Sequence, residues 1–361
     1  MKHSSWCAWA ALAVSAMWLA APAAAAADGA IAVGPRTVPV SGLISPAARK
    51  GVERGAAALA NRRTGTGFPP ASADKALWKR AIAAADAAYA PMIPAMRAET
   101  RASVQKTKMD GVDVYVGTPL QPRKDRQKQA VLHIHGGGFA MLADGSYAET
   151  MAAQIATRCG CTVYSVNYRV PPDFPYPTPV DDSLAVYRAL LKTMKPADIA
   201  VQGESAGGNI AASMVLKARD TGLPMPAMLV LLSSAFDLSR SGDSHVVNEG
   251  IDLALGSSIA SLIDLYAAGS DLKSPGLSPL FADFSKGFPP TFLKAGGREI
   301  LLSDSIAMHR ALRRAGIDAE LHIWEGMSHG PFGTPAAPAP EDNEVSAEVE
   351  HFLEAHWGRK P

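Results

Sequence analysis

Gly203-Glu204-Ser205-Ala206-Gly207 stands directly after a short apolar run, Ile199–Gln202, and directly before a helical pattern at residues 206–218. The flanking glycines permit a sharp strand-to-helix turn, because a side chain at either position would collide with neighbouring backbone. Such a turn exposes the serine hydroxyl, which needs a nearby base to become a nucleophile. Ordinary glycine and serine usage produces this spacing in roughly one chain in ten of this length, so its position between a strand and a helix carries the interpretation. Ser205 is therefore the candidate nucleophile.

Outward from this turn, short aliphatic runs alternate with longer helical patterns from Gly111 onward. We expect strands at residues 112–116, 130–135, 161–168, 199–203, 227–232, 291–295 and 319–324. We expect helices at residues 147–157, 181–194, 206–218, 304–315 and 341–357. Apolar strands that alternate with helices predict an α/β fold with a mostly parallel central sheet and helices on both faces.

Two regions lack a strand pattern. Residues 28–105 are rich in alanine and contain short helical stretches interrupted by Pro91 and Pro94, and residues 237–290 contain helical fragments, glycines and prolines. Long segments of this kind in compact domains are often functional lids. We expect both regions to contribute to a helical cap over the carboxyl ends of the strands.

A second glycine-rich stretch, His135-Gly136-Gly137-Gly138-Phe139, follows an earlier expected strand. Three glycines let backbone N–H groups approach a substrate carbonyl oxygen, where they stabilise the negative charge of a tetrahedral intermediate. The N–H group of Ala206, next to the candidate nucleophile, would complete this oxyanion hole. A flexible glycine loop without function is the alternative, and the pairing with the serine motif disfavours it.

The candidate base is one of six histidines that follow the serine: His245, His309, His322, His329, His351 and His356. Three fall inside expected helices, one lies in the region without strands, and one lies within the last strand. His329 comes just after that strand, in a loop of the kind that presents catalytic groups at the carboxyl end of a parallel sheet. We expect His329 to be the general base.

The candidate acid should lie between the serine and the histidine in sequence and should orient the imidazole. Glu299 follows the glycine pair at the end of the strand expected at 291–295. Asp304 stands at the start of the next helix, where helix capping is the plain alternative. We favour Glu299 because it is closer to the strand end, and we keep Asp304 as the alternative acid.

The composition and the histidine spacing bear on two kinds of partner, nucleic acid and a metal ion. The chain has 361 residues, with 35 Lys or Arg and 34 Asp or Glu. Nucleic-acid-binding proteins normally carry a basic excess or a basic stripe, so we expect no nucleic-acid partner. His133 and His135 share one face of a strand, but no third ligand is nearby, so we expect no metal and no cofactor.

The first 27 residues have the pattern of a secretory signal peptide. Lys2 is followed by an apolar run, Trp6–Ala20, and then by small residues that suit cleavage around Ala25 to Ala27. The apolar run is short for a membrane span, so we expect an exported protein, periplasmic or secreted, with no integral membrane segment after signal removal. An uncleaved N-terminal anchor is the alternative.

Two cysteines, Cys159 and Cys161, remain after the predicted cleavage. An oxidising compartment permits a disulfide. However, a Cys-Gly-Cys bridge closes a very tight loop and needs strained geometry. We therefore expect two reduced, partly buried thiols at a helix-to-strand junction.

Taken together, these motifs resemble the hormone-sensitive-lipase-like family of α/β-hydrolase esterases over residues 105–357. The match rests on residues 135–138 and 203–209, on Asn167-Tyr168-Arg169 and Phe174-Pro175-Tyr176-Pro177, and on the spacing to Glu299 and His329. The resemblance implies an α/β-hydrolase fold with a two-part helical cap. Together with the signal peptide expected at 1–27, this predicts N-terminal cap chain at 28–105 and a catalytic domain at 106–358 with a cap insertion at about 238–275.

The resemblance also implies residue roles. Gly137, Gly138 and Ala206 would donate the oxyanion-hole N–H groups, and His135 would brace the glycine loop. The family commonly has Asp before the nucleophile and Asp as the acid, whereas this chain has Glu204 and Glu299. A carboxylate of either length can orient a histidine, so these departures leave the activity in place.

The expected activity is hydrolysis of short-chain, relatively apolar carboxylic esters through an acyl-enzyme intermediate. A lactone hydrolase of the monoterpene-lactone type would use the same groups. A serine peptidase and a non-catalytic ligand-binding protein of the same fold are further alternatives. The oligomeric state and the natural substrate are not predicted.

Overall fold

The seven expected strands and one further strand form one eight-stranded sheet in the computed structural model, which describes residues 37–60, 67–256, 259–334 and 337–357. The strands are β1 (Ala102–Met109), β2 (Val112–Pro119), β3 (Ala130–Ile134), β4 (Thr162–Asn167), β5 (Ile199–Glu204), β6 (Met228–Leu232), β7 (Thr291–Gly296) and β8 (Ala319–Trp324). Their order across the sheet is β1-β2-β4-β3-β5-β6-β7-β8. The pairs β1–β2 and β2–β4 are antiparallel, and all the others are parallel. The prediction of a mostly parallel sheet is confirmed.

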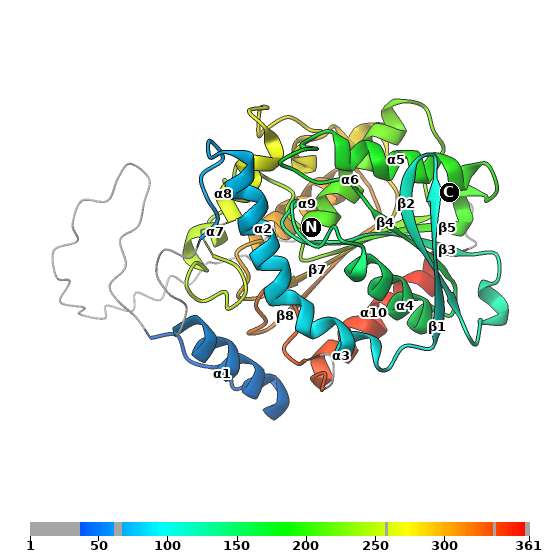
Figure 1. The fold of residues 1–361 in the computed structure, drawn as a ribbon. Coiled ribbons are helices and arrows are strands. Elements are labelled where there is room, and N and C mark those ends of the chain that lie inside the picture. Colours follow the sequence, from blue (N-terminus) through cyan, green and yellow to red (C-terminus); the bar gives the residue numbers. More distant parts are fainter. Residues whose placement is uncertain (1–36, 61–66, 257–258, 335–336, 358–361) are drawn as a thin grey trace, which may run out of the picture. The chain divides into compact units, whose positions relative to one another are not determined.

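Helices connect these strands and cover both faces of the sheet (Figure 1). The α-helices are α1 (Pro46–Ala60), α2 (Lys75–Tyr89), α3 (Ile93–Arg97), α4 (Ser146–Cys159), α5 (Thr178–Leu191), α6 (Ala206–Asp220), α7 (Ser244–Val247), α8 (Ile259–Ala267), α9 (Leu302–Arg314) and α10 (Pro340–His356). Short 3-10 turns are η1 (Ala90–Met92), η2 (Lys124–Arg126), η3 (Pro196–Asp198), η4 (Pro279–Phe281) and η5 (Phe284–Lys286).

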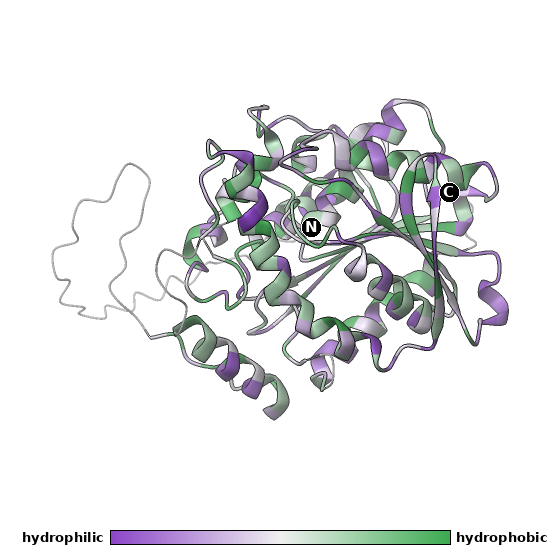
Figure 2. Ribbon diagram, viewed as in Figure 1, coloured by the Kyte–Doolittle hydropathy of each residue, from purple (hydrophilic) through white to green (hydrophobic). Residues whose placement is uncertain are grey.

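The core is divided by the sheet into two layers. Successive strand residues point to opposite faces, so Val131 packs with α4 and α10 on one side, whereas Leu132 packs with α5, α6 and α9 on the other. Figure 2 shows helices with hydrophobic and hydrophilic stretches side by side, as expected for helices with one buried face. This packing fixes the carboxyl ends of β3, β5, β7 and β8, where the candidate residues lie.

One strand was missed by the sequence analysis. Residues 102–109 form β1, although the catalytic domain was expected to begin at 106 with its first strand at 112. Most β1 side chains are exposed, and Lys106 and Lys108 lie on this edge of the sheet. An edge strand that is polar on both faces lacks the apolar alternation by which strands are recognised.

The regions without expected strands contain the remaining helices. α1, α2 and α3 precede β1, while α7 and α8 lie between β6 and β7. Trp78 and Ile82 of α2 pack with Leu262 and Leu265 of α8, and with Ala140, which follows the glycine loop. The two helical regions therefore meet beside that loop.

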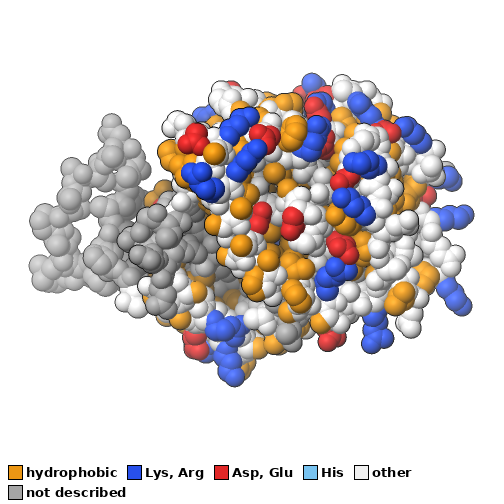
Figure 3. Space-filling view, in the orientation of Figure 1, with side chains coloured by type: hydrophobic (Ala, Val, Ile, Leu, Met, Phe, Trp, Pro, Cys, Tyr) orange, Lys and Arg blue, Asp and Glu red, His pale blue; other side chains and the backbone are white. Residues whose placement is uncertain are grey.

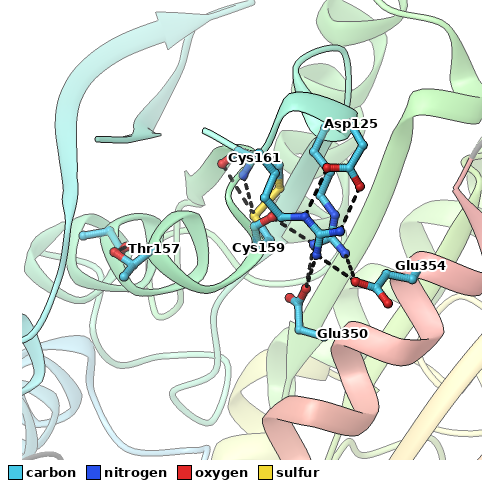
Figure 4. The surroundings of a disulfide bond; sticks show 9 residues. Asp125, Thr157, Cys159, Cys161, Glu350 and Glu354 are labelled. Atoms are coloured by element: carbon cyan, nitrogen blue, oxygen red, sulfur yellow. Dashed lines mark hydrogen bonds and ion pairs between the residues drawn. A yellow bond between two sulfur atoms is a disulfide. The ribbon is translucent and has the colours of Figure 1, made fainter. Parts of the chain in front are cut away.

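The expectation of two reduced thiols is wrong. Cys159 and Cys161 form a disulfide at the end of α4, with their Cα atoms 5.2 Å apart (Figure 4). Gly160 takes a left-handed conformation, with φ of 61°, and turns the chain between the two cysteines. This turn allows an ordinary Cα separation, within about 4.4–6.8 Å, which the sequence argument did not consider.

The described residues from Val40 onward form one compact unit. The predicted signal peptide at 1–27 lies outside the described residues. Among the residues that the structure describes, no helix combines the length and the apolar character needed to cross a bilayer.

Candidate active site

Ser205 lies at the junction between β5 and α6, in the sharp turn that the sequence predicts. Its φ of 55° and ψ of −125° are unusual for a residue with a side chain, so the surrounding structure must impose them. Its N–H group donates to the carbonyl of Leu232 on β6 at 2.9 Å. A Cβ atom at Gly207 would lie only 2.1 Å from the carbonyl oxygen of Ile134, so glycine is required where α6 begins against β3.

His329 and Glu299 lie in line with this serine. His329 Nε2 is 3.0 Å from Ser205 Oγ, within hydrogen-bond distance. On the other side of the ring, His329 Nδ1 is 3.6 Å from Glu299 Oε2. The second distance is longer than a hydrogen bond, but such contacts are often loose without substrate. The Glu299 side chain is fully buried, whereas 14% of the His329 side chain is exposed. The structure thus brings together the three residues that the sequence favoured.

Asp304, the alternative acid, lies in a different network. Its carboxylate accepts hydrogen bonds from the N–H groups of Phe236 and Asp237, at 2.8 and 3.0 Å. His245 Nε2 is 2.7 Å from its other oxygen. Burial raises the pKa of Asp304, an effect that the contact with His245 opposes. Asp304 therefore joins the chain after β6 to α9, and His245 is its partner.

The glycine loop, residues 135–138, passes close to Ser205 at Gly136. A Cβ atom at Gly136 would lie 3.2 Å from Ser205 Cβ, which shows how closely the loop approaches. Within the described residues, the N–H groups of Gly137 and Gly138 donate to no acceptor. Ala206 is the first residue of α6, where an N–H group has no intrahelical acceptor. That these three N–H groups bind a substrate oxygen stays a prediction.

Glu204 holds the start of this loop. Its carboxylate accepts a hydrogen bond from the N–H group of Gly136 at 3.0 Å, and its other oxygen is 2.8 Å from His133 Nε2. His133 Nδ1 in turn is 2.8 Å from Ser165 Oγ on β4. Burial opposes ionisation of Glu204, but His133 and the Gly136 N–H group outweigh it and lower the pKa of the carboxyl group. Glu204, the residue before Ser205, is therefore a charged link between His133 and the glycine loop.

His135, to which the resemblance assigns bracing of the loop, contacts Gly136 and Tyr168. Its Nδ1 donates to the Gly136 carbonyl at 2.7 Å, and its ring stacks on Tyr168 with centroids 4.3 Å apart. The Tyr168 hydroxyl donates to the His135 carbonyl at 2.7 Å. Burial lowers the pKa of His135 from 6.5 to about 4, so the ring is neutral at ordinary pH.

Comparison with known proteins identifies the family. A profile for the alpha/beta hydrolase fold matches residues 131–332, which include the glycine loop, Ser205, Glu299 and His329. The chain belongs to the α/β-hydrolase family. An acetyl-hydrolase from Streptomyces hygroscopicus is 32% identical over 203 residues, which are 56% of this chain and 67% of that protein.

Solved structures place this α/β hydrolase among the esterases. The crystal structure of esterase E25 superposes with a TM-score of 0.80 at 32% identity, over 91% of this chain and 99% of that one. An esterase from the bacterial hormone-sensitive lipase family superposes with a TM-score of 0.72 at 29% identity, over 87% and 99%. The resemblance seen in the sequence is confirmed, and the protein is a carboxylesterase-type serine hydrolase of this group.

The sequence analysis of this hydrolase missed one buried carboxylate. Asp252, in the insertion between β6 and β7, is fully buried and accepts hydrogen bonds from Ile300 and His329. These partners are 48 and 77 positions away in the chain. No motif surrounds Asp252, so the sequence carries no signal for it beyond a turn-forming aspartate.

A cavity of about 460 Å³ lies apart from these residues. It is lined by α2, by the turn between β1 and β2, and by the segment after β4, and neither Ser205, Glu299 nor His329 lines it. Its charged side chains neutralise one another, as in the pairs Lys79–Asp173 and Arg169–Asp182. Among the described residues, no group of three or more His, Cys, Asp or Glu is arranged to hold a metal ion.

The candidate active site is defined by the contacts among Ser205, His329 and Glu299.

Proposed function

We propose that this hydrolase cleaves carboxylic esters in two acyl-transfer steps. Ser205 is the nucleophile, His329 the general base, and Glu299 the acid that orients and charge-stabilises the imidazole. The observation that carries the proposal is the 3.0 Å contact between His329 Nε2 and Ser205 Oγ at the sharp turn. The esterases among its relatives support the reaction class.

In the first step, Ser205 Oγ bonds to the carbonyl carbon and its proton passes to His329 Nε2. The carbonyl oxygen takes the negative charge and accepts hydrogen bonds from Gly137, Gly138 and Ala206. The bond to the alcohol oxygen then breaks, and the alcohol leaves with the proton from Nε2.

In the second step, water attacks the acyl-serine carbonyl and gives a proton to His329 Nε2. The acyl–oxygen bond to Ser205 breaks, the carboxylic acid leaves, and the proton returns to Ser205 Oγ. The proton that Ser205 lost to the alcohol is replaced by one from water, so Ser205 and His329 end the cycle in their starting states and the cycle needs no cofactor.

The cap residues beside the oxyanion loop favour short, apolar acyl groups. A Cβ atom at Gly138 would lie 2.7 Å from Leu262 Cδ1 on α8, so this leucine lies against the expected position of the substrate carbonyl. Leu262 also packs with Trp78 of α2. An apolar wall close to the reacting carbon limits acyl length, and the relative named acetyl-hydrolase supports a small acyl group.

The test is turnover of p-nitrophenyl esters of increasing acyl length by the mature protein, beside Ser205→Ala. We expect the rate to be highest for short chains and to vanish in the variant. Turnover of lactones but of no linear ester would indicate instead that the protein is a lactone hydrolase that uses the same residues. Binding without turnover of any ester or lactone would instead indicate a non-catalytic ligand-binding protein.

A further inference from the structure

Asp252 bonds to both loops that carry the proposed acid and base. Its Oδ2 accepts a hydrogen bond from the N–H group of Ile300, the residue after Glu299, at 3.0 Å. Its Oδ1 accepts one from the N–H group of His329 itself at 3.3 Å. One buried carboxylate thus contacts the backbone beside each member of the Glu299–His329 pair.

The segment around Asp252 is firmly attached to the same two loops. The Asn248 side-chain amide donates to the Glu299 carbonyl at 2.9 Å, and the Leu253 N–H group donates to Ser328 Oγ at 3.2 Å. Asp252 Oδ1 also accepts from Ala254 and Leu255, at 3.0 and 3.1 Å. These local bonds fix the orientation of the carboxylate, so its contacts with the two loops are held in place.

The Glu299 side chain has little else to position it. Both of its carboxylate oxygens are buried and accept no hydrogen bond from the described residues. Its distance to His329 is therefore set mainly by the backbone of the two loops. These loops also bond directly, through the Arg298 N–H group and the Met327 carbonyl at 2.9 Å. Asp252 adds a second link between the two loops, at the residue after Glu299 and at His329 itself.

We propose that Asp252 is a positioning residue that sets the separation of Glu299 and His329. This inference rests on the proposed function, because it assigns Asp252 a role in aligning the proposed triad. The Asp252 side chain is fully buried and its oxygens are taken up by backbone N–H groups, so it acts through the two loops and does not touch substrate. A displacement of a catalytic group by about 1 Å can cost roughly a hundredfold in rate. Small shifts of these two loops would therefore be sufficient to lower kcat.

The experiment compares Asp252→Ala and Asp252→Asn with wild type, using p-nitrophenyl acetate. Asp237→Ala is the matched control, because Asp237 is a buried aspartate of the same insertion whose carboxylate accepts from Ser239 and Ser241 and contacts neither loop. We expect Asp252→Ala to lower kcat by at least about tenfold with KM changed less than about threefold. Asp252→Asn keeps an acceptor for His329 but not for Ile300, so we expect a smaller loss, and Asp237→Ala should stay within about twofold of wild type.

Repeating the Asp252 substitution in an enzyme that already carries Glu299→Gln separates positioning from general stabilisation. If Asp252 acts through the Glu299–His329 pair, Asp252→Ala should lower kcat less than about twofold once Glu299→Gln is already present, because residues that act as a unit are not additive. The proposal is overturned by an unchanged kcat, or by the same loss in both backgrounds. If Asp252→Ala does not fold, Asp252→Asn is compared in the same two enzymes. A smaller loss of kcat with Glu299→Gln present supports the proposal, and an unchanged kcat or an equal loss overturns it.

Ser205→Ala in this assay keeps the two proposals apart. Loss of turnover in Ser205→Ala together with a normal kcat in Asp252→Ala would reject the positioning role and leave the proposed function standing. Full turnover in Ser205→Ala would reject the proposed function itself, whatever the Asp252 variants show.

Discussion

At the scale of single residues, the acid assignment has the sharpest test, because the sequence offered two candidates. Glu299 lies 3.6 Å from His329, whereas Asp304 is taken up by His245 and by two backbone N–H groups. We predict that Glu299→Gln lowers kcat by about 10²- to 10⁴-fold, since the imidazolium formed in the reaction loses its counter-charge. Steady-state kinetics with p-nitrophenyl acetate measure this loss.

Asp304→Asn is the control for that comparison. We expect its kcat to remain within about threefold of wild type, although its stability should fall because Asp304 is buried and hydrogen-bonded. Similar losses of kcat in both variants, with both proteins folded, would contradict the choice of Glu299.

His135 predicts a pH dependence of stability. Its pKa is about 4 in the folded protein because of burial, and 6.5 is the ordinary value. Between these values the unfolded chain binds a proton that the folded chain does not, so the free energy of unfolding decreases as pH falls. The decrease is about 1.4 kcal/mol per pH unit within this window. Urea unfolding at pH 6.5 and pH 5 measures it.

His135→Gln provides the comparison, because it removes the titrating group and keeps a side-chain amide that can donate to the Gly136 carbonyl. We expect a shallower pH dependence of the free energy of unfolding in this variant over the same range. Equal slopes in the two proteins would show that His135 does not carry the effect.

The three residues that the sequence favoured and the structure brings together have local signals. Ser205 lies between two glycines, and His329 and Glu299 each follow a strand. Asp252 has no such signal, because its partners come from elements far along the chain. Contacts of this kind depend on the tertiary structure, which no local pattern encodes.

At the scale of elements, α1 has a direct contact with the loop that carries the base. A Cβ atom at Gly51 would lie 2.0 Å from the Phe332 carbonyl oxygen, so α1 can pack here only because residue 51 is glycine. Val52 and Ala48 pack in the same cluster as Met327 and Phe332, which flank His329. The helix therefore supports the 326–333 loop.

We predict that Gly51→Ala displaces α1 from this loop, lowers the free energy of unfolding by about 1–3 kcal/mol and reduces kcat. The matched control is Gly42→Ala, where an added Cβ atom meets nothing within 4 Å. Thermal unfolding and turnover of p-nitrophenyl acetate are measured for both. Indistinguishable behaviour of the two variants would mean that α1 does not support the loop.

Most elements could be predicted because their apolar periodicity is strong. The strand expected at 291–295 is β7, and the helix expected at 206–218 is α6. β1 could not be recognised, since its side chains are mostly polar and exposed. The Cys159–Cys161 disulfide was missed because the left-handed turn at Gly160 is a property of the backbone that residue spacing does not show.

At the scale of the whole molecule, positive and negative charges are nearly equal in number. The 35 basic and 34 acidic residues nearly balance, and Figure 3 shows both signs interspersed on the face in view. Such a surface offers no strong attraction to a charged ligand. We therefore propose that recognition of substrate depends on the apolar cap residues near the glycine loop.

We also propose that the full-length protein is exported. Lys2, the apolar run and the small residues before Asp28 suit a signal peptide. When the full chain is expressed in a bacterium, we expect the protein in the periplasm or medium, with an N-terminus near residues 26–28 by mass spectrometry. An uncleaved chain retained in the membrane fraction would indicate an anchor instead.

The central claim is that the chemistry passes through Ser205, and covalent trapping tests it most directly. The purified protein is treated with paraoxon, a phosphate ester that phosphorylates activated serines, and is then digested and analysed by mass spectrometry. We predict one diethylphosphoryl group per inactivated chain, on the peptide that contains Ser205, and much slower labelling in His329→Ala. An adduct on another residue, or ester turnover that persists after Ser205 is fully modified, would contradict the account.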